Sequence, residues 1–258
     1  MKYSTKANLH DLNVVVTRPA GQGRELAKLI TQAGGRAIRF PTIEIVPLAL
    51  RAQAHGQLQH LCASDWLIFI STHAAHYGMR CIRSADIAVD TIKVASIGTA
   101  TSRALRHLGI DVDLECPAPA GSESLLTTTE MRKVTGLSIV VFRGTGGREL
   151  LGKTLRERGA KVEYIECYER RCPGASLSDV PGPEQQAVFV TTSVNGFENL
   201  LQMVALQGCD YILDFNLVVF GERQLREARA LGWRGNIEAV RETSNLAILH
   251  KLREMANL

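Results

Sequence analysis

The chain has 258 residues, of which 45% are hydrophobic and 22% charged, and its formal net charge is +4. This length fits one large domain or two of ordinary size, and the composition excludes a disordered or fibrous protein. The charge is small and no block of Lys and Arg occurs, so we expect no nucleic-acid partner, although a small anionic ligand would suit the charge.

Three features of the sequence bear on its compartment. No apolar run approaches the roughly 20 residues needed to span a bilayer, so we expect no membrane segment. The first ten residues are polar and lack the apolar core of a secretory signal. The six cysteines are scattered, without a C-x-x-C pair or a histidine at metal-ligand spacing, which indicates reduced thiols rather than a metal or disulfide framework. The sequence therefore predicts a soluble cytoplasmic protein.

Short apolar runs alternate with amphipathic stretches along the chain. The first run ends at Thr17-Arg18-Pro19, and the stretch after it carries Leu26, Leu29 and Ile30 on one face. Nearly continuous β-branched runs are typical of strands covered on both faces, so we expect an α/β fold with parallel sheets flanked by helices. The predicted strands are Leu12–Val16, Ala37–Phe40, Trp66–Ile70, Val94–Ile97, Ile139–Phe142, Val162–Ile165, Ala187–Val190 and Leu217–Phe220.

An internal repeat organises these elements. The block GREL occurs at residues 23–26 and again at 147–150, and each copy is followed at the same spacing by a Gly-initiated apolar block. Arg18 and Arg143 end the strands that precede the two copies. A weaker pair of blocks, LIFIST at 67–72 and VFVTTS at 188–193, supports the same repeat. Matches in this order indicate two similar domains.

Two extended segments, Pro41–Leu50 and Glu163–Arg171, have no helix directly after them. Contiguous domains divided near residue 125 are one arrangement. If the two segments instead pair as a two-stranded β linker, the chain crosses between the domains twice. We then expect domain 1 to comprise residues 1–40 and 172–258, domain 2 to comprise 51–162, and the linker strands to comprise 41–50 and 163–171, with a ligand cleft between the domains.

Small and hydroxylated residues follow the carboxyl ends of four predicted strands, where open α/β sheets bind ligands. Such residues leave backbone N–H groups uncovered at helix N-termini, where carboxylates or phosphates can bind. Simple helix capping is the alternative for each turn. Because four such turns occur over both domains, we favour a shared anion site. The candidate residues are Ser71, Thr72, Gly98, Thr99, Thr101, Thr192, Ser193, Gly221 and Arg223.

Three arginines near the GREL blocks are further candidates. Arg18, Arg143 and Arg148 could clamp a ligand carboxylate bidentately, or each could form a salt bridge to a nearby acid such as Glu25 or Glu149. The glycine stretch after Arg143 resembles a phosphate loop but lacks the Lys-Ser/Thr ending, so a nucleotide-dependent transferase is the weakest interpretation.

Tyr168 lies in the second predicted linker. Its phenol could donate a proton to a leaving group, although packing is the alternative for a tyrosine on a strand. No Ser/His/Asp arrangement and no metal-protease motif occurs, and His73 and His76 have no evident third metal ligand. We therefore expect no metal and no cofactor.

A set of short motifs occurs in a fixed order along nearly the whole chain. They are Val15–Pro19, Ile70–Ala75, Ile97–Thr101, Gly121–Leu126, Phe142–Gly144 with Arg148–Leu150, and Cys167–Arg171. Taken together, these motifs resemble those of the uroporphyrinogen-III synthase family. The chain departs from the family pattern at Gly221-Glu222-Arg223, where a threonine or serine is common, and at Thr72-His73.

The resemblance implies two α/β domains on a two-stranded ladder and an enzyme that needs no cofactor. Its substrate would be hydroxymethylbilane, a linear tetrapyrrole with eight carboxylates. Loss of the terminal hydroxyl, a spiro intermediate and re-closure would invert the last ring, with water lost overall. Because the bare substrate closes to the wrong isomer, positioning is the main catalytic demand.

The resemblance also implies roles for particular residues. Tyr168 matches the tyrosine linked to hydroxyl departure and is expected to donate a proton. The hydroxylated turns with Ser71, Thr99, Thr101 and Ser193 are expected to hold the carboxylate arms through backbone amides, and Ser122 is placed in the same set. A monomer is expected, and a transient contact with the preceding pathway enzyme stays open. The rival interpretation is a two-domain anion-binding or sensor protein without turnover.

Overall fold

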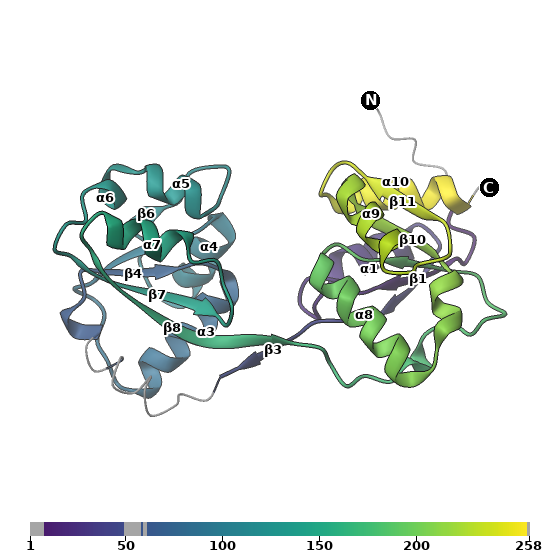
Figure 1. The fold of residues 1–258 in the computed structure, drawn as a ribbon, viewed down its shortest axis with the longest axis horizontal. Helices are drawn as coiled ribbons and strands as arrows, with labels where there is room; N and C mark the ends of the chain where they lie inside the picture. The colour runs from purple at the N-terminus through teal and green to yellow at the C-terminus, as the bar shows by residue number, and fades with distance from the viewer. Residues whose placement is uncertain (1–7, 49–57, 59–60, 257–258) are drawn as a thin grey trace. The chain divides into compact units, whose positions relative to one another are not determined.

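The computed structural model describes residues 8–48, 58 and 61–256. The chain divides into two compact units, Met1–Glu44 with Arg171–Leu258 (unit 1) and Ile45–Arg170 (unit 2). In Figure 1 the purple N-terminal segment and the yellow-green C-terminal third belong to unit 1, while the middle of the chain forms unit 2. Residues 49 and 50 of the first predicted linker strand lie outside the described residues.

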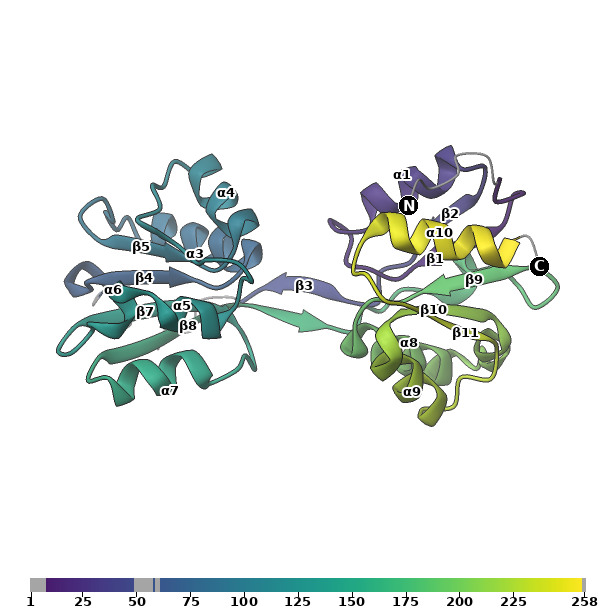
Figure 2. The same ribbon diagram turned by 90° about the horizontal axis from the view of Figure 1, so that it is seen from above.

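Unit 1 is a five-stranded sheet in the order β11-β10-β9-β1-β2, with parallel pairing throughout. Figure 2 shows α1 and α10 on one face of this sheet and α8 and α9 on the other, and each pair of helices shares a buried cluster with the sheet. The elements are β1 (Asn13–Val16), α1 (Arg24–Gln32), β2 (Arg36–Arg39), η2 (Leu177–Asp179), β9 (Ala187–Val190), α8 (Val194–Gln207), η3 (Asp210–Asp214), β10 (Asn216–Phe220), α9 (Gly221–Ala230), β11 (Ile237–Val240) and α10 (Asn245–Ala256).

Unit 2 is a six-stranded sheet in the order β3-β8-β7-β4-β5-β6. Helices α3 and α4 pack on one face, and α5, α6 and α7 pack on the other. The elements are β3 (Glu44–Pro47), η1 (Leu61–Ala63), β4 (Trp66–Phe69), α3 (Thr72–Ser84), β5 (Lys93–Ser96), α4 (Thr99–His107), β6 (Leu114–Glu115), α5 (Ser122–Thr127), α6 (Thr129–Arg132), β7 (Ser138–Gly144), α7 (Leu150–Glu157) and β8 (Lys161–Arg171).

Strand β4 shows why the strand sequences do not alternate. All four of its residues are buried: Leu67 and Phe69 join the cluster under α3 and α4, whereas Trp66 and Ile68 join the cluster under α5 to α7. A strand covered on both faces has no solvent side on which polar residues could alternate. Each fully buried large apolar side chain contributes about 1.5–3 kcal/mol. The predicted α/β class with helix-flanked parallel sheets is confirmed.

The internal repeat is visible in the topology. The sheet order of unit 1 read from β2 (β2-β1-β9-β10-β11) matches the order β8-β7-β4-β5-β6 of unit 2, so β1-α1-β2 corresponds to β7-α7-β8. This agreement confirms two similar domains. It also places Arg18 and Arg143 after or within equivalent strands.

The two extended segments pair as expected, because β3 is a hydrogen-bonded neighbour of β8 and the Leu48 N–H donates to the Cys167 carbonyl at 3.1 Å. Strand β8 runs unbroken over eleven residues, Lys161–Arg171, and its first part pairs with β7. The sequence patterns missed β6 and β11. Strand β6 has only two residues and β11 carries Glu238 in its middle, so neither shows an apolar run.

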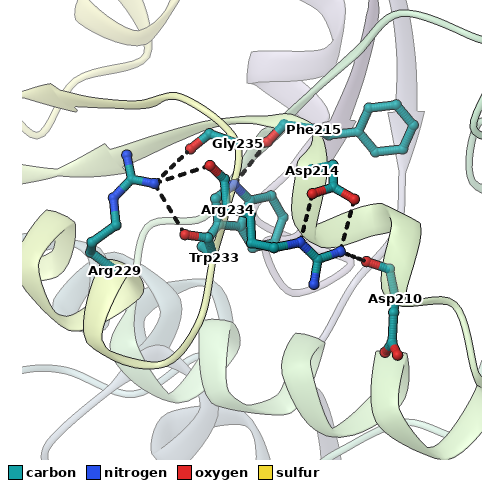
Figure 3. A network of polar contacts seen from close by, with 7 residues as sticks. All are labelled: Asp210, Asp214, Phe215, Arg229, Trp233, Arg234 and Gly235. Atoms are coloured by element: carbon teal, nitrogen blue, oxygen red, sulfur yellow. Dashed lines mark hydrogen bonds and ion pairs between the residues drawn. The ribbon is translucent and has the colours of Figure 1, made fainter.

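A network of polar contacts fixes the amino ends of β10 and β11 (Figure 3). The Arg234 guanidinium binds both carboxylate oxygens of Asp214, at 2.6 and 2.8 Å. The Arg229 Nη1 donates to the carbonyls of Trp233, Arg234 and Gly235, each at 3.1 Å. The buried Trp233 indole donates to the Phe215 carbonyl at 2.8 Å. These contacts join η3 to the turn before β11.

The structure bears on the expectations for the cysteines and for membrane-spanning helices. All six cysteines are free thiols, as predicted. Among the described residues, no helix has both the length and the apolar character needed to cross a bilayer.

Candidate active site

The phenol of Tyr168 meets a serine hydroxyl at the carboxyl edge of the unit 2 sheet. Tyr168 lies on β8 opposite Gly144 of β7, and a methyl group on Gly144 would come within 2.6 Å of the Tyr168 ring. The residue is 2% exposed, and its hydroxyl lies 3.1 Å from Ser71 Oγ. The fold therefore brings two of the predicted site residues, Tyr168 and Ser71, into contact.

Ser71 is also the N-cap of α3. Its Oγ accepts a hydrogen bond from the Ala74 N–H at 3.0 Å, so the capping role considered for this residue is present. A hydroxyl has two acceptor positions and one donor. Ser71 can therefore accept from both Ala74 and Tyr168 and still donate its own proton. The half-buried Thr72 is the first residue of α3.

Two aromatic side chains of α3 flank the phenol. The ring centroids of His73 and Tyr77 lie 5.6 and 6.0 Å from that of Tyr168. Burial lowers the pKa of His73, and the charges of Arg170 and His76 lower it further. A neutral imidazole therefore lies beside the phenol near pH 7. The sequence patterns did not select His73; the available signal was its place two residues after Ser71.

The turn before α4 offers backbone groups rather than side chains. Its N-cap residue, Gly98, has φ of +86° and provides no side-chain cap, and the following Thr99 is exposed. Thr101 is buried, and its hydroxyl donates to the Ile97 carbonyl at 2.9 Å. The Thr101 hydroxyl is thus bonded to the residue before the N-cap, and the amides at the helix N-terminus are the groups that can bind an anion here.

A second polar cluster lies at the carboxyl edge of the unit 1 sheet. The Arg18 Nε donates to Thr192 Oγ1 at 3.3 Å, and its Nη1 donates to Asn245 Oδ1 at 2.6 Å. The guanidinium carbon lies 5.7 Å from the Phe220 ring centroid. Burial lowers the pKa of Arg18, while Glu25 acts in the opposite direction. Arg18 and Thr192 were both predicted site residues, whereas Asn245 was not.

The remaining turns of unit 1 repeat those of unit 2. Ser193 caps α8 through the Gly196 N–H at 3.1 Å, as Ser71 caps α3. Helix α9 begins at Gly221, which has φ of +70°, and no side-chain cap is present, as at Gly98. The exposed Arg223 side chain pairs with Glu227 on the next turn of the same helix at 3.0 Å.

Arg143 and Arg148 are held by acidic side chains. Arg143 is 8% exposed and pairs with Glu149 at 2.7 Å and Glu166 at 3.1 Å. Burial acts to lower the pKa of Arg143, but the two carboxylates outweigh it and the pKa is raised. The exposed Arg148 pairs with Glu123 at 3.2 Å. The geometry thus favours the salt-bridge alternative for both arginines. Ser122 is the first residue of α5, where no side-chain cap is present.

Comparison with known proteins gives one consistent result. The family model described as uroporphyrinogen-III synthase HemD matches residues 24–248. The chain is 31% identical over 247 residues to the uroporphyrinogen-III synthase of Escherichia coli (strain K12), an alignment that covers 94% of this chain and 100% of that protein. The chain belongs to the uroporphyrinogen-III synthase family. A second relative, the uroporphyrinogen-III synthase of Salmonella typhimurium (strain LT2), is 30% identical over 251 residues, covering 94% of this chain and 100% of the relative.

The fold agrees with this family. The solved structure of uroporphyrinogen-III synthetase from Helicobacter pylori 26695 superposes with a TM-score of 0.63 at 12% identity, covering 95% of this chain and 99% of that chain. The uroporphyrinogen-III synthase motifs recognised in the sequence thus lie on the two-domain fold expected for them. Within the part of the chain that the structure describes, no group of three His, Cys, Asp or Glu side chains could hold a metal ion.

Proposed function

We propose that this protein is a uroporphyrinogen-III synthase that cyclises hydroxymethylbilane to uroporphyrinogen III, with inversion of the last pyrrole ring and loss of water. The observation that carries the proposal is the family match over residues 24–248, a region that contains the Tyr168–Ser71 hydroxyl pair. A binding or sensor protein would require neither the match nor the pair.

The Tyr168 phenol supplies the proton for departure of the substrate hydroxyl. Because Tyr168 is 2% exposed and Ser71 is half-buried, the proton passes from Tyr168 to Ser71 and from Ser71 to the leaving oxygen. The C–O bond breaks, water leaves, and an electrophilic azafulvenium cation remains. The last ring attacks this cation through the α-carbon that already carries its link to the chain, which forms the spiro carbon–carbon bond. The older link then breaks, and the other α-carbon of the ring bonds to the released methylene, which inverts the ring. The proton lost from that carbon as the ring regains aromaticity returns to the phenolate, so no acid is consumed.

The carboxylate arms bind at the uncapped helix N-termini and at Arg18. Helix α4 begins after Gly98 and helix α9 begins at Gly221, and neither has a side-chain cap, so their first amides and their positive dipole ends can bind carboxylates. Arg18 uses two of its five N–H donors on Thr192 and Asn245, and a guanidinium can bind a carboxylate with the others. Catalysis then consists mainly of holding a flexible polyanion in one conformation.

The free state of all six thiols supports a further part of the proposal, that the enzyme works in the reducing cytoplasm. We also propose that it acts as a monomer and receives its labile substrate through transient contact with the preceding pathway enzyme.

Turnover separates the proposed enzyme from a binding protein. Freshly generated hydroxymethylbilane is added in large molar excess over the protein, and uroporphyrinogen III is measured against time. An enzyme forms many equivalents of the type III isomer. A binding protein would leave the substrate to close spontaneously, apart from at most one protected equivalent, and that result would overturn the proposal.

A further inference from the structure

We propose that Asn245 is a positioning residue that keeps the Arg18 guanidinium available to a substrate carboxylate by holding it apart from Glu25. The inference rests on the proposed function, because it assigns Arg18 to the binding of an anionic substrate. It adds a residue that lies outside every motif found in the sequence.

The amide of Asn245 lies between the two charged groups. Ser244 caps α10 by accepting from the Ala247 N–H at 3.1 Å, which places Asn245 in the first turn of that helix. Its Oδ1 accepts from Arg18 Nη1 at 2.6 Å, and its Nδ2 donates to Glu25 Oε2 at 3.3 Å. This amide orientation is fixed by chemistry, since a guanidinium only donates and a carboxylate only accepts.

Unit 2 contains an equivalent arginine–glutamate pair that has no side-chain amide like that of Asn245 between its members. Glu149 occupies the same place in the second GREL block that Glu25 occupies in the first, and Arg143 lies near the carboxyl end of the equivalent strand, β7. There the arginine binds the glutamate directly at 2.7 Å and is 8% exposed. Helix α5, which follows β6 as α10 follows β11, has the sequence SESLLT and contains no side-chain amide. The repeat therefore supplies an internal comparison for the effect of Asn245.

Arg143 is bound by a carboxylate and Arg18 by a neutral amide, and this difference determines which of the two arginines can bind a ligand. A carboxylate bound to a guanidinium occupies the donors that a substrate carboxylate needs and cancels the charge that attracts it. The neutral amide of Asn245 binds Arg18 without cancelling its charge, and at the same time it engages Glu25. Consistently, the net pKa shift of Arg143 is upward and that of Arg18 is downward. Arg18 is thus prepared for an external anion, whereas Arg143 is neutralised by the protein.

The test is a set of variants assayed for turnover and for binding of uroporphyrin III, a stable octacarboxylate. In Asn245→Ala the arginine can collapse onto Glu25, so KM and the Kd of uroporphyrin III should rise about tenfold, as expected for one lost charged hydrogen bond, while kcat stays close to wild type. The isosteric Asn245→Asp adds a negative charge beside Arg18 and should raise both values as well. Leu246→Ala, at a neighbour that is 57% exposed, is the matched control on the same helix and should leave both unchanged.

The deciding variant is the double substitution Asn245→Ala with Glu25→Gln. If Asn245 acts by separating Arg18 from Glu25, removal of the Glu25 charge restores KM and Kd toward wild type. Single variants with unchanged constants, or a double variant as weak as Asn245→Ala, would overturn the inference. Should the wild-type protein make no type III isomer, the proposed function fails, but the uroporphyrin III measurements still judge the role of Asn245.

Discussion

At the scale of single residues, the hydroxyls of Tyr168 and Ser71 lie 3.1 Å apart, and a substitution that removes only the phenol hydroxyl tests a chemical role against a packing role. The ring of Tyr168 is part of the buried cluster under α3 and α4, so its removal would damage the fold. Tyr168→Phe keeps the ring and removes only the hydroxyl. We expect this variant to lose about 100-fold or more in kcat, the usual contribution of a general acid, with its unfolding transition retained.

The neighbouring tyrosine provides the control. Tyr77 packs against Tyr168 with ring centroids 6.0 Å apart, and its own hydroxyl donates to the Ile45 carbonyl at 3.4 Å. Tyr77→Phe should therefore keep turnover close to wild type. Wild-type turnover in Tyr168→Phe would remove the phenol from the mechanism.

We expect Cys167, the residue next to Tyr168, to make the free energy of unfolding depend on pH. Burial, followed by the proximity of Cys81, raises the pKa of Cys167 from 9.0 to about 12. The folded protein therefore keeps a proton that the unfolded chain loses above pH 9. This contribution to stability is complete below that pH and is lost as the pH rises toward 12, with a slope of about 1.4 kcal/mol per pH unit.

Urea denaturation of the wild type and of Cys167→Ala measures this effect. The wild type should lose its stability advantage over the variant by about 1.4 kcal/mol when the pH is raised from about 8 to about 10. The difference between the two proteins isolates Cys167 from the lysines and tyrosines that also titrate in this range. A difference that stays constant with pH would show that the thiol is not protected in the folded state.

At the scale of elements, the two ends of the unit 1 strands carry different groups of residues. The carboxyl edges carry the capped and uncapped helix N-termini, whereas the amino edge of unit 1 carries the network of Arg229, Arg234 and Asp214 in Figure 3. Elements joined in this way can stabilise the fold without taking part in the chemistry. Stability and catalysis should therefore be separable by substitution.

Trp233 tests this separation. Trp233→Phe keeps an aromatic ring near Phe189 but leaves the Phe215 carbonyl without its 2.8 Å indole donor. We expect a loss of about 2 kcal/mol in the free energy of unfolding, with kcat per folded molecule unchanged. Lys153→Ala, which removes an exposed ion pair to Glu157 within α7, should cost less than about 0.5 kcal/mol. Loss of kcat in folded Trp233→Phe would contradict the assignment of the amino edge to stability alone.

At the scale of the whole molecule, the sequence predicted what local patterns encode. Buried parallel strands produce apolar runs, and repeated sequence blocks produced equivalent βαβ units, so the α/β class and the two similar domains could be predicted. The short β6 and the mixed β11 carry no such run. The strand-end turns also marked Ser71 and Thr192, because helix N-termini have recognisable residues.

Contacts between distant parts of the chain could not be predicted in the same way. Arg18 and Asn245 are 227 residues apart, and no local pattern connects them. The ion pair between Arg143 and Glu149 could be predicted in part, because Glu149 belongs to the adjacent GREL block and was considered as a salt-bridge partner. The contact between His73 and Tyr168 could not be predicted from the sequence. It arises because β8 pairs with β7 beside β4, which brings Tyr168 to the first turn of α3.

The isomer composition of the cyclised product tests most directly whether this protein is a uroporphyrinogen-III synthase. Hydroxymethylbilane is incubated with catalytic amounts of the protein, with a chelator present in a parallel sample, and the oxidised uroporphyrins are separated into types I and III. Type III should predominate in both samples, and a control without protein should give type I. Type I alone in the presence of folded protein would contradict the proposed function.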